Sequence, residues 1–126
     1  AYEDLDRHRA LQPLRSQAYF WIDANTPAGA RFLASDDGML HAVTHRHGFS
    51  LHPAPRLTRA ALVHFLGNAP LFARAEGLDY ILLTPYDYAS LLTPVERRQV
   101  QAKIEADSSY LTVYANDGVV IKRRSF

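Results

Sequence analysis

The sequence predicts one α/β domain over residues 1–126, a small Rossmann-like sandwich with a mostly parallel sheet, helical crossovers and a C-terminal antiparallel hairpin. Helical and strand patterns alternate along most of the chain, which is typical of parallel strands joined by helices. Two apolar runs flank the turn Asn116-Asp117-Gly118 and predict the hairpin. The length of 126 residues, with 48% hydrophobic and 21% charged residues, is that of a single globular domain.

The first predicted element is an amphipathic helix. Residues 1–12 are charged and predict a solvated helical lead-in, after which Pro13 suits the first turn of a helix. Positions at helical spacing predict a buried stripe: Leu14, Ala18, Trp21 and Ile22. Pro27 and Gly29 mark the end of this helix.

The next elements are predicted to be short. Residues 30–35 predict a buried strand, and the pair Asp36-Asp37 can cap a helix over residues 39–44. The alternating residues 49–52 predict a second strand. The turn after the first strand has one glycine instead of the three of the dinucleotide-binding fingerprint, so the order of elements alone predicts no nucleotide site.

The middle of the chain predicts two helices and the central strand. Thr58 can cap the first helix. Its predicted inward-facing residues are Ala61, Leu62, Phe65 and Leu66. A short helix starts again at Pro70 and ends at Gly77, and residues 79–85 form the clearest buried strand.

The last predicted helix has a strong start signal. The run Thr93-Pro94-Val95-Glu96 combines a capping residue, a first-turn proline and a glutamate that can reach back to the cap. Val100 and Ile104 are predicted to face inward. Residues 110–114 and 119–123 are the predicted hairpin strands.

The composition excludes several classes of function. The chain contains no cysteine, which excludes disulfides, thiolate zinc sites and cysteine nucleophiles. Its formal charge of +1 predicts no nucleic-acid partner. No apolar stretch approaches the roughly 20 residues that cross a bilayer, and no signal peptide is visible. Because the chain begins at Ala1 and its only methionine is Met39, we expect a processed chain or a piece of a longer protein.

A histidine-rich segment has the spacing of a metal site. His41 and His45 are four residues apart and share a helix face. Ala42 stands where the metalloprotease motif has a glutamate, and the neighbouring Arg46 disfavours a cation. Surface histidines are therefore the favoured interpretation, and we assign no metal and no cofactor.

No catalytic residue is assigned either. No serine lies in a Gly-x-Ser-x-Gly turn between a strand and a helix. The adjacent pair Asp36-Asp37 is poorly placed to act on one bond as an acid and a base, because neighbours on a chain rarely converge.

Other polar residues have two interpretations each. Arg46 offers a bidentate fork for phosphate or carboxylate, whereas an ion pair with Asp36 or Asp37 is the commoner arrangement. The run Lys122-Arg123-Arg124 predicts charges that guard an edge strand, with attraction to anionic lipid headgroups as the alternative. Tyr86 and Tyr88 can line a carbohydrate or lipid-phosphate groove, or cover an end of the sheet.

Several segments together resemble one known family. Residues 19–30 resemble the helix end W-I-x-x-N-T-P-x-x-A, and a later short helix ends in Thr44-His45-Arg46 where that family commonly has Thr-Gly-Arg. Residues 79–83 resemble its D-Y-(apolar) central strand, and residues 114–121 resemble its closing hairpin. The chain resembles the soluble C-terminal domain of polytopic membrane glycosyltransferases of the GT-C superfamily, similar to bacterial relatives of the dolichyl-phosphate-mannose–protein mannosyltransferases.

The resemblance implies a division of labour. In such enzymes the catalytic carboxylate lies in the first extracytoplasmic loop of the transmembrane region, so this segment would contain no catalytic residue. It would be a periplasmic accessory domain attached to the membrane. Its partners would be the transmembrane region of the same polypeptide and the polyprenyl-phosphate sugar or the acceptor.

The ligand-binding surface is expected beyond the strand ends. Its predicted residues are Asp36, His41, Thr44, Arg46 and Tyr86. Alanine at Arg46 is expected to lower turnover of the parent enzyme and to leave the isolated domain folded. The alternative is a free-standing binding module for a small anionic or carbohydrate ligand. A small hydrolase and a plain protein-interaction domain are further alternatives.

Overall fold

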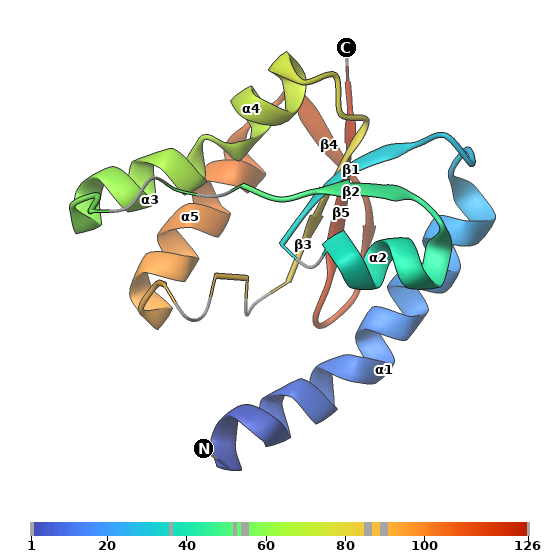
Figure 1. Ribbon diagram of the computed structural model, residues 1–126, viewed down its shortest axis with the longest axis horizontal. Helices are drawn as coiled ribbons and strands as arrows, with labels where there is room; N and C mark the ends of the chain where they lie inside the picture. Colours follow the sequence, from blue (N-terminus) through green and yellow to red (C-terminus); the bar gives the residue numbers. More distant parts are fainter. Residues whose placement is uncertain are drawn as a thin grey trace.

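The computed structural model describes residues 2–35, 37–51, 53, 56–84, 87–88 and 91–125, without the side chains of residues 2–11 and 37–39. A five-stranded sheet lies between two helical layers (Figure 1). The elements are α1 (Tyr2–Asn25), β1 (Arg31–Ala34), α2 (Asp37–Thr44), β2 (His47–Phe49), α3 (Arg59–Gly67), α4 (Ala69–Ala75), β3 (Tyr80–Leu83), α5 (Pro94–Ala106), β4 (Tyr110–Ala115) and β5 (Val120–Arg124). None of the described helices is both long and apolar enough to cross a membrane.

The sheet is mixed, with strand order β2-β1-β3-β5-β4. Strand β1 pairs in parallel with β2 and β3, and β5 pairs antiparallel with β3 and β4. The α/β class, the order of the elements and the C-terminal hairpin are confirmed. The parallel part is confined to β2, β1 and β3, because the return strand β5 inserts between β3 and β4. Since β2 and β3 lie on opposite sides of β1, the order of the strands reverses between β1 and β3.

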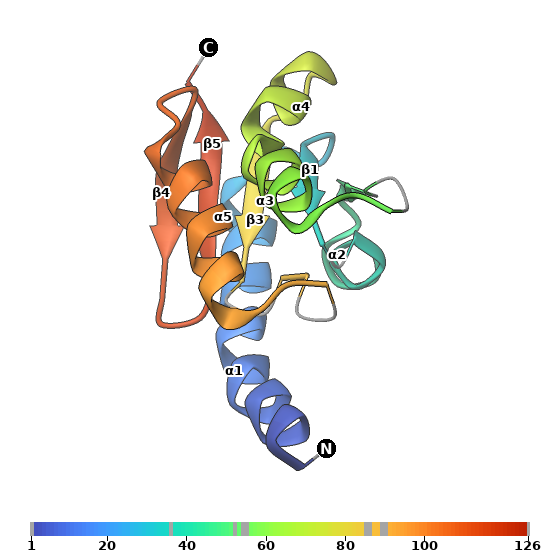
Figure 2. The same ribbon diagram turned by 90° about the vertical axis from the view of Figure 1, so that its left-hand side faces the viewer.

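Each face of the sheet has its own apolar core (Figures 1 and 2). One core joins α1 and α2 to the sheet and includes Ala18, Tyr19, Ile22, Phe32, Leu40, Tyr80 and Ile121. The other joins α3, α4 and α5 to the opposite face and includes Leu33, Leu62, Leu66, Ala73, Ile81, Val100, Ile104 and Tyr110. Helices on both faces protect the short, fully buried strand β3 from water.

Helix α1 is longer than the expected amphipathic helix. The charged lead-in and the amphipathic part form one helix of 24 residues, and Pro13 lies inside it instead of in its first turn. Proline has no N–H to donate to the preceding turn. Pro13 is exposed, so water can satisfy the carbonyl group that its missing N–H leaves unpaired. Ala18 and Ile22 are fully buried, as predicted.

Strand β2 and helix α2 begin earlier than expected. The predicted bounds of the second strand, 49–52, were wrong. Strand β2 is His47–Phe49 and therefore begins two residues earlier. Its register pairs Arg31 with His47 and Leu33 with Phe49. The pairing stops at Leu33, so the residues after Phe49 have no partner in β1. Helix α2 begins at Asp37, two residues before the expected start.

The local start and stop signals of the middle helices are confirmed. The Thr58 side chain caps α3, because its Oγ1 accepts from the Ala61 N–H at 3.1 Å. Pro70 lies in the first turn of α4, and Gly77 follows that helix at a φ of 69°. The prediction that Phe65 faces inward was wrong: 38% of it is exposed, because the buried stripe of α3 is narrow and centred on Leu62 and Leu66.

Helix α5 has the predicted capping box. The Glu96 N–H donates to Thr93 Oγ1 at 3.2 Å, and the Thr93 N–H donates to Glu96 Oε1 at 2.9 Å. Val100 and Ile104 are buried, as predicted. Because cap, first-turn proline and glutamate agree, the start of this helix is defined by local chemistry.

Lys122 does not guard an edge of the sheet. Strand β5 lies between β3 and β4, so the prediction that the run Lys122-Arg123-Arg124 guards an edge strand was wrong. Only 2% of Lys122 is exposed, and its Nζ donates to the carbonyl oxygens of Ile104 and Glu105 at 3.1 and 3.0 Å. Burial lowers the pKa of Lys122, while Glu105 and Asp107 act to raise it. The ammonium group thus binds the C-terminal end of α5, where a positive charge is favourable.

We expect Lys122→Met to destabilise the domain by about 1–2 kcal/mol, because the apolar stem is kept and two hydrogen bonds to carbonyl groups are lost. Urea unfolding followed by circular dichroism measures this loss. Lys103→Met, an exposed replacement on α5, is the control and should change stability by less than about 0.5 kcal/mol. Equal stability of the two variants would contradict a structural role for Lys122.

Candidate functional site

The structure places the predicted site residues in different environments. Asp36 and Tyr86 lie outside the described residues. Thr44 and Arg46 are buried, with 1% and 7% exposed, and His41 is exposed on α2. These three lie near the amino end of β2, whereas the carboxyl ends of the parallel strands lie at the opposite end of the sheet.

Arg46 binds the C-terminal end of α1. Its Nε donates to Thr26 Oγ1 at 3.1 Å, its Nη2 to the Thr26 carbonyl at 2.9 Å and its Nη1 to the Thr44 carbonyl at 2.8 Å. The exposed carboxylate of Asp23 lies 3.5 Å from Nη1. Two of the segments that carry the family resemblance, N-T-P and Thr-His-Arg, are therefore joined directly by hydrogen bonds.

Two histidine rings, those of His45 and His47, lie against the ring of His41. Its ring stacks on that of His47 at 5.7 Å between centroids, and the ring of His45 meets it edge-on at 6.5 Å. His41 Nδ1 lies 3.3 Å from the Arg46 carbonyl oxygen. Among the described side chains, no three of His, Cys, Asp or Glu are placed to hold a metal ion.

A groove of about 580 Å³ opens at the amino ends of β1 and β3. We name it the amino-end groove. Its lining residues are Pro27, Gly29 and Ala30 from the turn between α1 and β1, Asp79 and Tyr80 at the start of β3, and Arg123 and Arg124 at the end of β5. The volume lies in the range of small-molecule sites, which is roughly 300–1,000 Å³.

The backbone around the amino-end groove is well fixed. Asp79 Oδ2 accepts from the Arg31 N–H at 3.0 Å, and the Asp79 N–H donates to the Arg31 carbonyl at 2.9 Å. Tyr80 is opposite Arg123 in the register of β3 and β5. Its ring stacks on Phe32, with centroids 4.8 Å apart. The start of β3 is therefore held to both of its neighbouring strands.

The amino-end groove has room for a ligand. The Nε of Arg124, one of the lining residues, has no hydrogen-bond partner among the described residues, but it is closed to solvent and therefore also to a ligand in the groove. A Cβ atom added at Gly29 would meet no heavy atom within 4 Å, so the groove is open at this point.

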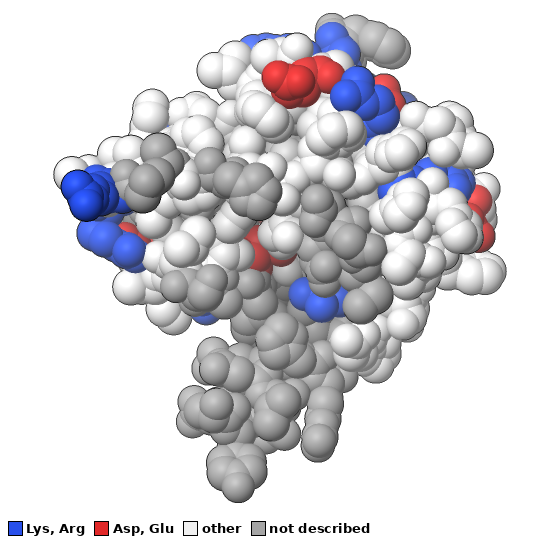
Figure 3. Space-filling model, in the orientation of Figure 1, with Lys and Arg blue, Asp and Glu red and all other residues white. Residues whose placement is uncertain are grey.

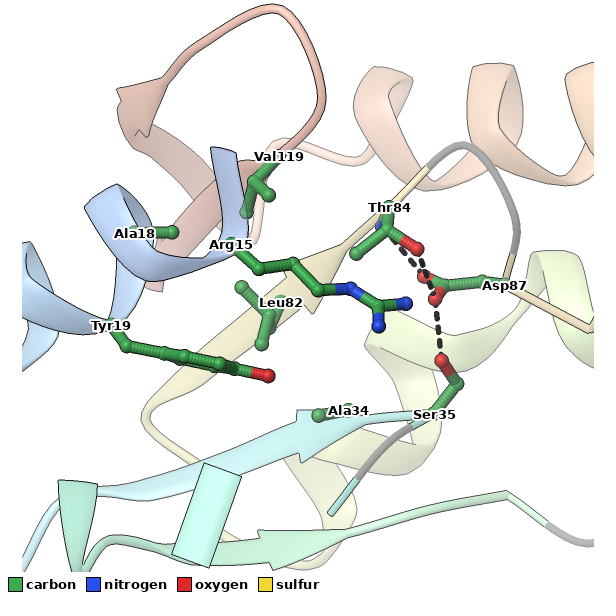
Figure 4. A pocket seen from close by; sticks show the side chains of 9 residues that line it. All are labelled: Arg15, Ala18, Tyr19, Ala34, Ser35, Leu82, Thr84, Asp87 and Val119. Atoms are coloured by element: carbon green, nitrogen blue, oxygen red, sulfur yellow. Dashed lines mark hydrogen bonds between the residues drawn. The ribbon is translucent and has the colours of Figure 1, made fainter. Parts of the chain in front are cut away.

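A second polar cluster lies at the carboxyl ends of β1 and β3. This strand-end network consists of Ser35, Thr84 and Asp87 (Figure 4). The Asp87 carboxylate accepts from the Ser35 hydroxyl, from the Thr84 N–H at 2.8 Å and from the Thr84 hydroxyl at 2.7 Å. Figure 4 shows the guanidinium of Arg15 and the hydroxyl of Tyr19 pointing from α1 toward the same space. Open α/β sheets commonly bind ligands at this position, where the strand order reverses.

The space within the strand-end network is too small for an organic ligand. The cavity measures about 10 Å³, which is close to the roughly 10–15 Å³ that one water molecule needs. Burial raises the pKa of Asp87, while its hydrogen bonds from Ser35 and Thr84 and the charge of Arg15 act to lower it. The network therefore serves best to anchor the start of the loop after β3, and the amino-end groove is the better candidate site.

Sequence reasoning missed the main members of both clusters. Asp87 lay in an aromatic loop, and Ser35 was overlooked beside the acidic pair that follows it. The sequence predicts Arg123 and Arg124 as edge-strand charges, with attraction to lipid headgroups as the alternative, and not as part of a groove. Pro27, Gly29 and the start of β3 are predicted as a helix end and a buried strand, and family resemblance was the available signal that these segments share a role.

Charge is unevenly spread over the surface. On the face seen in Figure 3, basic and acidic groups of the described residues form small separate areas on a largely uncharged surface.

Comparisons with known proteins do not assign a family. No protein-family model matches the sequence. No curated protein is significantly similar to it.

Proposed function

We propose that the chain is a non-catalytic, extracytoplasmic accessory domain of a membrane glycosyltransferase, which transfers sugar from a polyprenyl-phosphate-linked donor. In this role it helps to shape access of the acceptor or donor. One observation carries the proposal. Residues from two motif segments that are far apart in the chain, Pro27, Gly29 and Ala30 in one and Asp79 and Tyr80 in the other, line the same groove.

The remaining motif contacts support the same interpretation. Thr26 and Arg46 bind each other next to the groove. Asn116, in the hairpin segment, donates to the Leu14 carbonyl on α1 at 3.0 Å and accepts from the Gly118 and Val119 N–H groups, both at 2.8 Å. The segments that resemble the GT-C domain therefore line the groove at the amino end of β3 and brace α1 from the hairpin turn beside the carboxyl end of β3, as expected of motifs that specify a domain.

The finer classification of the fold is also a proposal. The order β2-β1-β3, with parallel pairing and helices on both faces, supports a small Rossmann-like domain that lacks the glycine fingerprint. An experimental structure in which β3 lay beside β2 instead of β1 would contradict it.

Blocking the groove tests the proposed function. In membranes that contain the full-length parent enzyme, we expect Gly29→Leu to lower sugar transfer by about tenfold, equivalent to roughly 1.4 kcal/mol. Gly29 has no positive φ and open space at its Cβ position, so the variant should fold. Ala28→Leu is the matched control, because it adds a similar side chain in the same turn outside the groove lining. Equal transfer by both variants at equal protein level would contradict the proposal.

Reading the coding frame upstream of Ala1 separates this proposal from the alternative of a free-standing binding module. Several hydrophobic spans of about 20 residues, with an acidic residue in the first outward-facing loop, would support a membrane transferase. A start codon or signal peptide directly before Ala1 would support the binding module, whose ligand would occupy the same groove.

The extracytoplasmic position has its own test. The chain has no cysteine, so Gln99→Cys on exposed α5 introduces one thiol into this domain. In intact cells we expect a membrane-impermeant maleimide to label this variant more strongly than the parent without the added cysteine. Labelling only after lysis would contradict an extracytoplasmic position.

A further inference from the structure

The amino-end groove combines positive charge with open volume. We propose that it binds the phosphate group of a small organic phosphate, with Arg123 and Arg124 as the residues that hold the anion. The proposal does not rest on the glycosyltransferase assignment, because all lining residues belong to the chain itself.

The charges of the lining residues favour an anion. Two lining residues are cationic and one, Asp79, is acidic. The Asp79 carboxylate already accepts from the Arg31 N–H, which is part of the pairing between β1 and β3. The guanidinium groups of Arg123 and Arg124 each present a planar set of donors that matches the oxygens of a phosphate group.

The shape of the groove favours a phosphate ester over the free ion. Its volume of about 580 Å³ is much larger than one phosphate group. The exposed Pro27 adds apolar surface for an organic moiety, and the open position at Gly29 leaves room for it.

Titration of the 126-residue chain with phenyl phosphate, followed by amide NMR shifts, tests the proposal. We expect saturable shifts centred on Gly29, Ala30 and Tyr80. Arg123→Gln and Arg124→Gln should each raise the apparent Kd by about tenfold. Arg98→Gln removes an equal charge from an exposed site on α5 and should change the Kd by less than roughly twofold.

The source of the phosphate is distinguished by parallel arms. Inorganic phosphate tests the anion alone, and vesicles of phosphatidylcholine with or without phosphatidic acid test a lipid headgroup. Binding in any phosphate arm that Arg123→Gln weakens supports the site, and the arm that binds tightest identifies the source. Arg123 is exposed, so this variant should fold even where Arg124→Gln does not. Absence of saturable shifts with every phosphate probe, or equal affinity of the wild type and Arg123→Gln, would overturn the proposal.

Discussion

The Arg46→Ala variant is expected to lose about 3 kcal/mol of unfolding free energy. Its guanidinium binds the carbonyls of Thr26 and Thr44 and the hydroxyl of Thr26, and these buried acceptors would lose their donors. Each buried polar group left unpaired costs about 1–3 kcal/mol, and the lost side chain also leaves a cavity. The burial of Arg46 thus changes the expectation for this variant from a surface effect on turnover to a loss of stability.

Urea unfolding of the isolated domain measures the effect, with two further variants for comparison. Arg46→Lys keeps the charge without the planar fork, so it should recover only part of the lost stability. His47→Ala changes an exposed neighbour and should lie within about 0.5 kcal/mol of the wild type. Wild-type stability of Arg46→Ala would show that the contacts with Thr26 and Thr44 contribute nothing.

The elements that local chemistry defines could be predicted from the sequence. The capping box at Thr93 and Glu96 formed as expected, because the residues that satisfy the first N–H groups are adjacent in the chain. The bounds of β2 could not be predicted in this way. They depend on which residues pair with the neighbouring strand β1, which is a tertiary property.

The environment of charged residues was the hardest part to predict. Lys122 and Arg46 are both buried against the end of a helix. Nothing in the sequence around them distinguishes them from a lysine or arginine on the surface. The amino-end groove draws residues from three separate segments, so spacing along the chain carries no signal for it. Family resemblance pointed to two of those segments, and only the sheet register showed that the C-terminal arginines join them.

Asp87 is expected to make the domain less stable as the pH rises above about 4. Burial raises the pKa of this carboxyl group above its ordinary value. Below the ordinary value the group is protonated in both the folded and the unfolded state. Between the ordinary and the raised pKa only the folded state keeps the proton, so the free energy of unfolding falls as the pH increases through this window. Above the raised pKa the loss is complete.

Two replacements at Asp87 separate the charge from the hydrogen bonds. Asp87→Asn keeps an acceptor for the Thr84 N–H and cannot ionise, so it should stay within about 1 kcal/mol of the wild type and flatten this part of the pH profile. Asp87→Ala leaves that N–H and the hydroxyls of Ser35 and Thr84 without their acceptor, and should cost about 2–4 kcal/mol at every pH.

The difference between wild type and Asp87→Asn is the quantity to measure, by urea unfolding from about pH 4 to pH 8. Other groups titrate with the opposite sign, since the hydrogen bond from Arg59 lowers the pKa of Glu96 to about 2 and its contribution is lost only in acid. The contribution of Glu96 cancels in the difference between the wild type and Asp87→Asn, because Glu96 lies outside the strand-end network. A difference that stays constant across the range would show that the folded state does not retain the proton on Asp87. If the wild type gains stability relative to Asp87→Asn as the pH falls toward 4, the folded state holds the proton on the carboxyl group of Asp87, which joins Ser35 to Thr84.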